Sequence, residues 1–310
     1  MSQRFSLVVP VYNEEAMIPL LSQTLTVFLS DLSRPSEIIV VDDGSSDRTL
    51  QLLLEWGARD PRVVVVQLSR NFGHQNAVMA GLATATGDLI GIIDGDLQDP
   101  PEVMGAMIEE LEKGFDVVYA VRMSRKEGVL LKSAYWLAYR IINAMAERPM
   151  PMDSGDFAVM RRPVVEQLLQ LNEQRLFLRG LRSWVGFTQV AFPYERHARA
   201  RGIPKYRLKQ LWRLLRDGIY GFTSFPMRLM RWIGFIVILG STAYSAWLVG
   251  ALFFGIPAPP GFATLALALC FFGGTQLLAT GIIGEYVARI YDDVRGRPRF
   301  IIQKTHKSEK

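Results

Sequence analysis

The chain has 310 residues, a formal net charge of +5 and 49% apolar residues, so it can hold one large domain and a further element. Its single cysteine, Cys270, excludes a disulfide framework and is consistent with a cytoplasmic catalytic part. The opening stretch MSQRFSLVVPVYNEE has no charged region followed by an apolar one, so it is expected to form a strand, not a signal peptide.

Short apolar runs and stretches with helical spacing alternate over the first 120 residues. The apolar runs are 5–11, 37–42, 63–68, 88–93 and 116–121, and the helical stretches are 14–30, 47–59, 74–85 and 101–113. This alternation predicts an α/β fold, with a mostly parallel, Rossmann-like sheet covered by helices. Ligands of such sheets bind beyond the carboxyl ends of the strands.

Carboxylates gather at those predicted strand ends. Glu14 follows the first run, Asp42 and Asp43 end the second, and Asp94 and Asp96 follow the fourth. Acids this close repel one another unless a cation lies between them. Mg²⁺ and Mn²⁺ prefer oxygen ligands and often share carboxylates with substrate phosphates, which favours a metal site after the fourth run.

Residues 92–102 have two other possible interpretations, of which one fits the sequence in part. An EF-hand calcium loop is excluded, because Leu97, Pro100 and Pro101 do not fit its spacing and further ligands are needed. A solvated turn accounts for part of the segment. In that interpretation Asp99 is the N-cap of the next helix and Pro100 is its first residue.

The segment 196–231 is strongly basic, with ten Lys or Arg residues and one acid, Asp217. Leu208, Leu211, Trp212 and Leu215 recur at helical spacing within it. This pattern predicts an amphipathic helix on an anionic membrane surface. The alternatives are a solvated helix with a core stripe and a nucleic-acid-binding segment. The apolar region that follows argues against the second.

No charged residue or histidine occurs from Trp232 to Gly284. A membrane helix needs about 20 apolar residues, and the segment GIPAPPG at 255–261 divides the run. The sequence therefore predicts two transmembrane helices, at about 232–254 and 263–286; a buried hairpin of a soluble protein is the alternative. Arginines flank the run on both sides and are absent from the turn, which predicts cytoplasmic termini.

Four segments together resemble the family 2 glycosyltransferases of the GT-A fold. They are VVPVYNEE (8–15), VVDDGSSD (40–47), NFGHQNAVMAGLATATGD (71–88) and DGDLQDPPE (94–102). The segments 202–219 and 281–302 resemble the polyprenyl-phosphate glycosyltransferases, the group of dolichol-phosphate mannose synthases and bacterial undecaprenyl-phosphate glucosyltransferases. The resemblance covers essentially the whole chain. The expected parts are a catalytic domain (1–195), a basic interfacial segment (196–231), a transmembrane hairpin (232–286) and a cytoplasmic tail (287–310).

The resemblance also implies the site residues. Those expected to bind the nucleotide are Pro10, Tyr12, Glu14, Asp42, Asp43 and Asp94. Those expected to hold Mg²⁺ or Mn²⁺ are Asp94, Asp96 and Gln98. Those expected to bind the acceptor phosphate are Arg122, Arg125 and Lys205. Asp156, in the segment DSGDF (153–157), is the expected catalytic aspartate, whereas His74 and His197 are expected to be structural or to neighbour phosphate.

The function implied is inverting transfer of a hexose from a nucleotide sugar to a polyprenyl phosphate, at the cytoplasmic face of the plasma membrane. UDP-glucose is the favoured donor, with GDP-mannose and a modified UDP-arabinose as alternatives. The expected partners are the donor, the lipid, the membrane and further copies of the chain, but no nucleic acid. A processive polysaccharide synthase would need more membrane helices and a Gln-x-x-Arg-Trp signature. A non-catalytic scaffold of the same fold is the alternative from another class.

Overall fold

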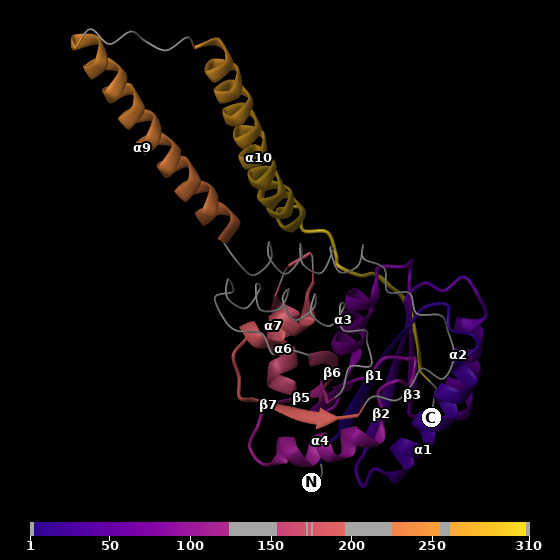
Figure 1. The fold of residues 1–310 in the computed structure, drawn as a ribbon. Helices are drawn as coiled ribbons and strands as arrows, with labels where there is room; N and C mark the ends of the chain where they lie inside the picture. Colours follow the sequence, from indigo (N-terminus) through magenta and orange to yellow (C-terminus); the bar gives the residue numbers. More distant parts are fainter. Residues whose placement is uncertain are drawn as a thin grey trace.

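The computed structural model describes residues 3–123, 154–171, 173–174, 176–195, 225–254 and 261–307. Within these residues, one eight-stranded sheet is packed with helices, and two long helices extend away from it (Figure 1). The strands are β1 (Phe5–Val11), β2 (Ser36–Asp42), β3 (Val63–Leu68), β4 (Leu89–Ile92), β5 (Val117–Arg122), β6 (Ser154–Arg161), β7 (Gln189–Tyr194) and β8 (Ile302–Lys307). The helices are α1 (Ile18–Asp31), α2 (Thr49–Arg59), α3 (His74–Thr84), α4 (Glu102–Glu112), α6 (Arg162–Gln170), α7 (Leu178–Trp184), α9 (Phe225–Phe253) and α10 (Phe262–Val294).

The strand order is β7-β5-β6-β4-β1-β2-β3-β8. The four central strands, from β4 to β3, are parallel, as the alternation of runs and helices predicts. The flanks are mixed: β6 pairs antiparallel with both β4 and β5, β7 pairs parallel with β5, and β8 pairs antiparallel with β3. The sheet is therefore a mixed α/β sheet with a parallel centre.

The parallel centre is buried on both faces. Along β1, Leu7 and Val9 face one hydrophobic cluster and Val8 faces the other, because successive side chains of a strand point to opposite faces. This double burial explains the continuous apolar runs of the sequence. Helix α3 lies very close to β1, since a Cβ atom at Gly81 would overlap the side chain of Val8. The close packing fixes the start of α3 at the carboxyl edge of the sheet.

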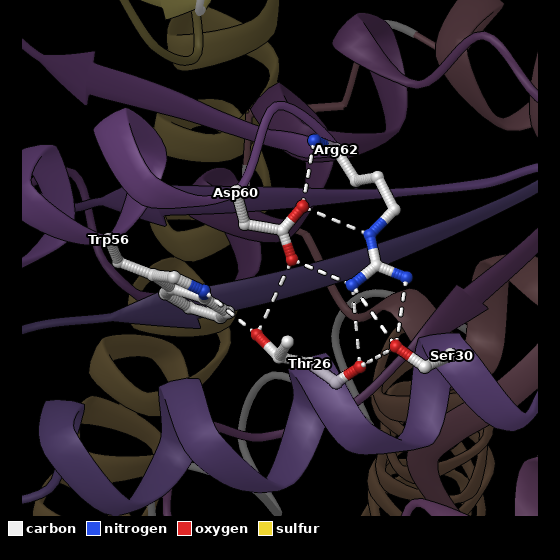
Figure 2. A network of polar contacts seen from close by, with 5 residues as sticks. All are labelled: Thr26, Ser30, Trp56, Asp60 and Arg62. Carbon is white, nitrogen blue, oxygen red and sulfur yellow. Dashed lines mark hydrogen bonds and ion pairs between the residues drawn. The ribbon is translucent and has the colours of Figure 1, made fainter.

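A polar network joins α1 to the turn between α2 and β3 (Figure 2). Arg62 donates from Nε and Nη2 to the Asp60 carboxylate, at 2.9 and 2.8 Å. The Trp56 indole donates to Thr26 Oγ1 at 3.2 Å, and the Arg62 guanidinium reaches Ser30 Oγ at 3.3 Å. These contacts lie at the amino end of β3, so they stabilise the sheet at the edge opposite to the acidic strand ends.

Helix α9 covers the predicted stretch 232–254 as far as Phe253 and begins seven residues before it, and α10 includes the predicted stretch 263–286 and extends beyond both of its ends. Among the described residues, no helix reaches both the length and the hydropathy needed to cross a membrane. Many large apolar side chains on both helices are nonetheless exposed, for example Ile236 at 65% and Leu277 at 76%.

The end of α10 returns to the sheet domain. The Gln174 backbone N–H donates to Asp293 Oδ1 at 2.9 Å, and the Gln174 side chain donates to the Arg297 carbonyl at 2.8 Å. Phe300 packs against the cluster beneath α3 and α6. The chain then adds β8 to the free edge of β3, as the yellow segment of Figure 1 shows. The last helix is thus connected to the sheet by side chains and by a strand.

Candidate active site

A cavity of about 300 Å³ lies at the carboxyl ends of β1, β2 and β4. Six of the residues predicted to bind the nucleotide or the metal are among those that line it: Pro10, Tyr12, Glu14, Asp43, Asp94 and Asp96. The loop before α3 contributes Asn71, Gly73 and His74. The structure therefore brings together at one edge the acids that the sequence separates by more than 80 positions.

The loops after β1 and β2 hold each other in place. Asn13, at φ 51°, donates its backbone N–H to Ser45 Oγ at 3.0 Å and accepts from the Ser46 N–H at 2.8 Å. Asparagine tolerates this left-handed conformation better than most residues. The Glu14 N–H donates to Thr49 Oγ1 at 2.9 Å. Tyr12 is nearly half exposed between these anchored neighbours, at the mouth of the cavity.

Asp42 and Asp43 differ in their surroundings. Asp42 is buried, does not line the cavity, and accepts from the Ser45 N–H at 3.3 Å. Asp43 accepts from the backbone N–H groups of Phe72 and Gly73, at 2.7 and 2.9 Å, and so anchors the turn into α3. Burial raises the pKa of both carboxyl groups. Asp43 thus has a structural role in addition to the predicted one.

Asp94 and Asp96 follow β4 on a tight loop. A Cβ atom at Gly95 would lie 2.8 Å from Val11 Cγ1, so only glycine allows the loop to pass this close to β1. Asp96 Oδ1 accepts from the Gln98 N–H at 3.2 Å, and Leu97 has φ 51°. Gln98 itself is not among the residues that line the cavity.

The charges of this loop fit a cation. Burial raises the pKa of Asp94, the His74 charge opposes this, and the like charges of Asp156, Asp99 and Asp96 add to the rise. In the part of the chain that the structure describes, no three His, Cys, Asp or Glu side chains form a complete metal cluster. A divalent ion held by Asp94 and Asp96 could complete its coordination with oxygen atoms of phosphate or water, which is how Mg²⁺ is often bound.

Asp156 is buried on β6 and held by three side chains. Gln75 Nε2 donates to its Oδ2 at 2.8 Å, and Arg179 Nε donates to its Oδ1 at 3.0 Å. His74 Nε2 lies 3.4 Å from Asp156 Oδ2 and 3.6 Å from Asp94 Oδ1, so it lies between the two carboxylates. Asp156 does not line the cavity, but His74 does.

These contacts shift two pKa values. Burial disfavours the imidazolium form of His74, but the hydrogen bond to Asp156 and the charges of Asp94 and Asp156 outweigh burial and raise its pKa to about 9. Burial also opposes ionisation of Asp156, but Arg179 and His74 lower its pKa well below the ordinary value. At neutral pH the site therefore contains an ionised Asp156 next to a cationic His74.

The sequence indicated no role for Gln75 or Arg179. Gln75 precedes Asp156 by 81 positions and lies in the quoted segment 71–88, but no role was predicted for it; Arg179 follows Asp156 by 23 positions and lies in none of the quoted segments. Gln75 Oε1 also accepts the Leu178 N–H at 2.9 Å, which fixes the start of α7 against α3. The prediction for His74 as a structural or phosphate-neighbouring residue is compatible with its position between the carboxylates.

One expectation for the 92–102 segment is wrong. Asp99 is not the N-cap of α4: the helix begins at Glu102, Pro101 precedes it, and no side chain caps it. The buried Asp99 carboxylate instead accepts from the Tyr194 hydroxyl at 2.5 Å. Arg122 Nε donates to the same hydroxyl at 3.4 Å. Of the residues predicted to bind the acceptor phosphate, Arg125 and Lys205 lie outside the described residues.

Residues 6–169 match the family described as Glycosyl transferase family 2. The uncharacterized glycosyltransferase YkcC of Bacillus subtilis (strain 168) is 40% identical over 304 residues, which cover 98% of this chain and 94% of that protein. The chain belongs to glycosyl transferase family 2.

Two further relatives of this glycosyltransferase have more specific names. The SfII prophage-derived bactoprenol glucosyl transferase of Shigella flexneri is 40% identical over 307 residues, covering 98% of this chain and 99% of that protein. The undecaprenyl-phosphate 4-deoxy-4-formamido-L-arabinose transferase of Pectobacterium atrosepticum is 37% identical over 308 residues, covering 97% and 93%. Among solved structures, the mannosyltransferase PcManGT from Pyrobaculum calidifontis in complex with GDP-Man and Mn²⁺ aligns with a TM-score of 0.48 at 20% identity, covering 95% and 88%.

Proposed function

We propose that this glycosyltransferase moves a hexose from a nucleotide sugar to a polyprenyl phosphate, with inversion at the anomeric carbon. The observation that carries the proposal is the likeness, over nearly whole chains, to two relatives named for bactoprenol and undecaprenyl-phosphate transfer. Glucose from UDP-glucose is the first choice of donor, since one of these relatives is named a glucosyl transferase. Mannose from GDP-mannose and a modified arabinose from a UDP donor are the alternatives.

The cavity at the strand ends would hold the donor. Its lining combines a half-exposed tyrosine ring for the base with acids at the loop after β4, where a diphosphate and a metal would meet. Asp94 and Asp96, with Gln98 close by, would hold Mg²⁺ or Mn²⁺. Bound there, the ion would neutralise the charge of the departing nucleoside diphosphate.

The acceptor phosphate would attack the anomeric carbon, forming the new C–O bond as the bond to the diphosphate breaks. A phosphate monoester loses its second proton with a pKa near 6, so the nucleophile is already a dianion at neutral pH. Arg122 would hold this phosphate together with Arg125 and Lys205, because guanidinium geometry matches phosphate oxygens. Asp156, ionised and held by three side chains, would orient the sugar or stabilise positive charge at the anomeric carbon.

Helices α9 and α10 would anchor the enzyme in the plasma membrane, with the sheet domain and both termini in the cytoplasm. The support is the large exposed apolar surface of both helices, which water solvates poorly, and the lack of charge from Trp232 to Gly284. A Cβ atom at Gly273, Gly274, Gly281 or Gly284 would meet nothing within 4 Å. These small positions would admit close packing with helices of further copies.

The topology can be tested by thiol labelling in intact cells. In a Cys270→Ala background, a cysteine at Ala258, between the two helices, should react with a membrane-impermeant reagent. A cysteine at Glu112, an exposed position on α4, should react only after lysis. Labelling of both positions only after lysis would contradict the proposed membrane hairpin.

A panel of nucleotide sugars tests the reaction. Purified enzyme with undecaprenyl phosphate and Mn²⁺ should form a lipid-linked sugar from UDP-glucose faster than from GDP-mannose or a modified UDP-arabinose. Product extracted into organic solvent and identified by mass gives the readout. Turnover of no donor would favour the non-catalytic scaffold, whereas growth of a long polymer would favour a processive synthase.

A further inference from the structure

The buried Tyr194 connects Arg122, the residue proposed to bind the acceptor phosphate, to the loop that follows β4. Tyr194 is the last residue of β7 and is 5% exposed; its register partner on β5 is Arg122. Its ring packs edge-on against Phe157 of β6, with the ring centroids 5.4 Å apart. Its hydroxyl thereby reaches Asp99, which follows β4.

The hydroxyl has two charged neighbours. It donates to Asp99 Oδ1 at 2.5 Å and accepts from Arg122 Nε at 3.4 Å. Burial and the Asp99 charge raise the pKa of Tyr194, so the hydroxyl keeps the proton that it donates. Within the described residues, the terminal nitrogens of Arg122 make no hydrogen bond, and a Cβ atom at Gly155, one residue from Asp156, would lie 3.8 Å from Arg122 Nη2.

We propose that the Tyr194 hydroxyl is a positioning group that separates the Arg122 guanidinium from the Asp99 carboxylate, and so leaves the terminal nitrogens of Arg122 for the acceptor phosphate. The inference rests on the proposed role of Arg122 in binding that phosphate. A buried carboxylate is costly unless it is hydrogen-bonded or paired with a cation. If the hydroxyl is removed, Asp99 loses one of its partners, and Arg122, whose charge already interacts with that of Asp99, is placed to take the position of this donor.

Tyr194→Phe should therefore let Arg122 pair directly with Asp99 and withdraw from the acceptor. The Kd of a short-chain prenyl phosphate, measured on the full-length enzyme in detergent without donor, should rise about tenfold, as expected for one charge-assisted hydrogen bond. The KM for the nucleotide sugar should stay within about twofold, because the cavity lining is unchanged. Tyr291→Phe, at an exposed tyrosine near the end of α10, is the matched control and should change neither constant.

A second variant separates positioning from simple damage to the fold. Asp99→Asn keeps an acceptor for the Tyr194 hydroxyl but removes the negative charge that would trap Arg122. In Tyr194→Phe/Asp99→Asn, the Kd for the prenyl phosphate should therefore return to within about threefold of the Asp99→Asn value. A structural role would instead make the double variant bind no better than Tyr194→Phe, and that result would overturn the inference.

Arg122→Ala separates a failure of the inference about Tyr194 from a failure of the proposed role of Arg122. If it weakens binding of the prenyl phosphate and Tyr194→Phe does not, the inference about Tyr194 fails while the proposed role of Arg122 stands. If Arg122→Ala leaves this Kd unchanged, the role of Arg122 fails first. Melting temperatures of all variants show whether each is folded, and the binding measurement needs no turnover.

Discussion

Asp94→Asn and Asp96→Asn are each expected to lower the rate of sugar transfer by about a thousandfold, a typical loss when a major electrostatic contact of a transition state is removed. Both carboxylates line the cavity, and the mutual repulsion of the acids around Asp94 is relieved best by a cation. EDTA should reduce the activity of the wild-type enzyme similarly, and Mn²⁺ should restore it. Asp31→Asn, an exposed acid at the end of α1, serves as the matched control.

The same substitutions should not weaken the fold. The pKa of Asp94 is raised, so the ionised form is less favourable in the folded chain than in the unfolded chain at neutral pH. Asp94→Asn removes that unfavourable charge, and its melting temperature without metal should equal or exceed that of the wild type. Full activity of the wild type in EDTA would contradict the metal site, and a lower melting temperature of Asp94→Asn would contradict the electrostatic account.

Asp156→Asn is expected to lower kcat by about two to three orders of magnitude, a loss in the range reported for removal of an electrostatic contact, and by the same factor at every pH from 6 to 8. Arg179 and His74 lower the pKa of Asp156 so strongly that this carboxylate is a poor proton acceptor. The phosphate acceptor is already largely deprotonated in this range. The ratio of mutant to wild-type kcat, measured at saturating donor and acceptor across the range, gives the readout.

The alternative role for Asp156 gives a different profile. If Asp156 were a general base, its loss would matter less at high pH, where the acceptor deprotonates unaided, so the mutant rate would approach that of the wild type.

Asp156 and Asp94 should also differ in their effects on the stability of the fold. Because the folded-state pKa of Asp156 is lowered, its carboxylate stabilises the fold above its unfolded pKa, and this contribution is lost as pH falls. Asp156→Asn should therefore lower the melting temperature at pH 7.

The parallel centre of the fold was predictable because each strand is buried on both faces. β1, β2 and β3 appear in the sequence as mainly apolar runs, and the predicted limits agree with the observed ones to within one residue. α1 begins at Ile18, later than the predicted residue 14, because residues 14–17 form a turn in which the Met17 N–H donates to the Glu14 carbonyl at 2.8 Å. Helical spacing does not distinguish this turn from a helix.

The antiparallel flanks were not predictable in the same way. β8 carries the sequence IQKTHK, which is largely polar and exposed because it lies at an edge of the sheet. Its pairing with β3 depends on a contact between residues far apart in the chain. The periodicity of apolar residues in a single sequence indicates which positions are buried. It does not indicate which distant strand pairs with the edge of a sheet.

The candidate site also contains residues that the sequence could predict and residues that it could not. Asp94 and Asp96 could be placed because topology alone brings the ends of parallel strands to one edge. The partners of Asp156 could not be predicted, because Gln75 on α3 and Arg179 on α7 reach it from parts of the chain that are far apart in the sequence. The prediction of Asp99 as an N-cap rested on the preference for aspartate at helix starts. In the structure its carboxylate instead accepts a buried hydrogen bond from the Tyr194 hydroxyl.

The pairing of β8 with β3 also has a consequence for biosynthesis. β3 ends at Leu68 and β8 starts at Ile302, so the ribosome must add more than 230 residues after β3 before this edge can close. At about 5–20 residues per second, that delay is on the order of ten to fifty seconds. During this interval β3 exposes a row of unpaired backbone groups, a template for pairing with another nascent chain. A stop codon before Ile302 would make that exposure permanent, so a truncation that removes β8 should promote aggregation.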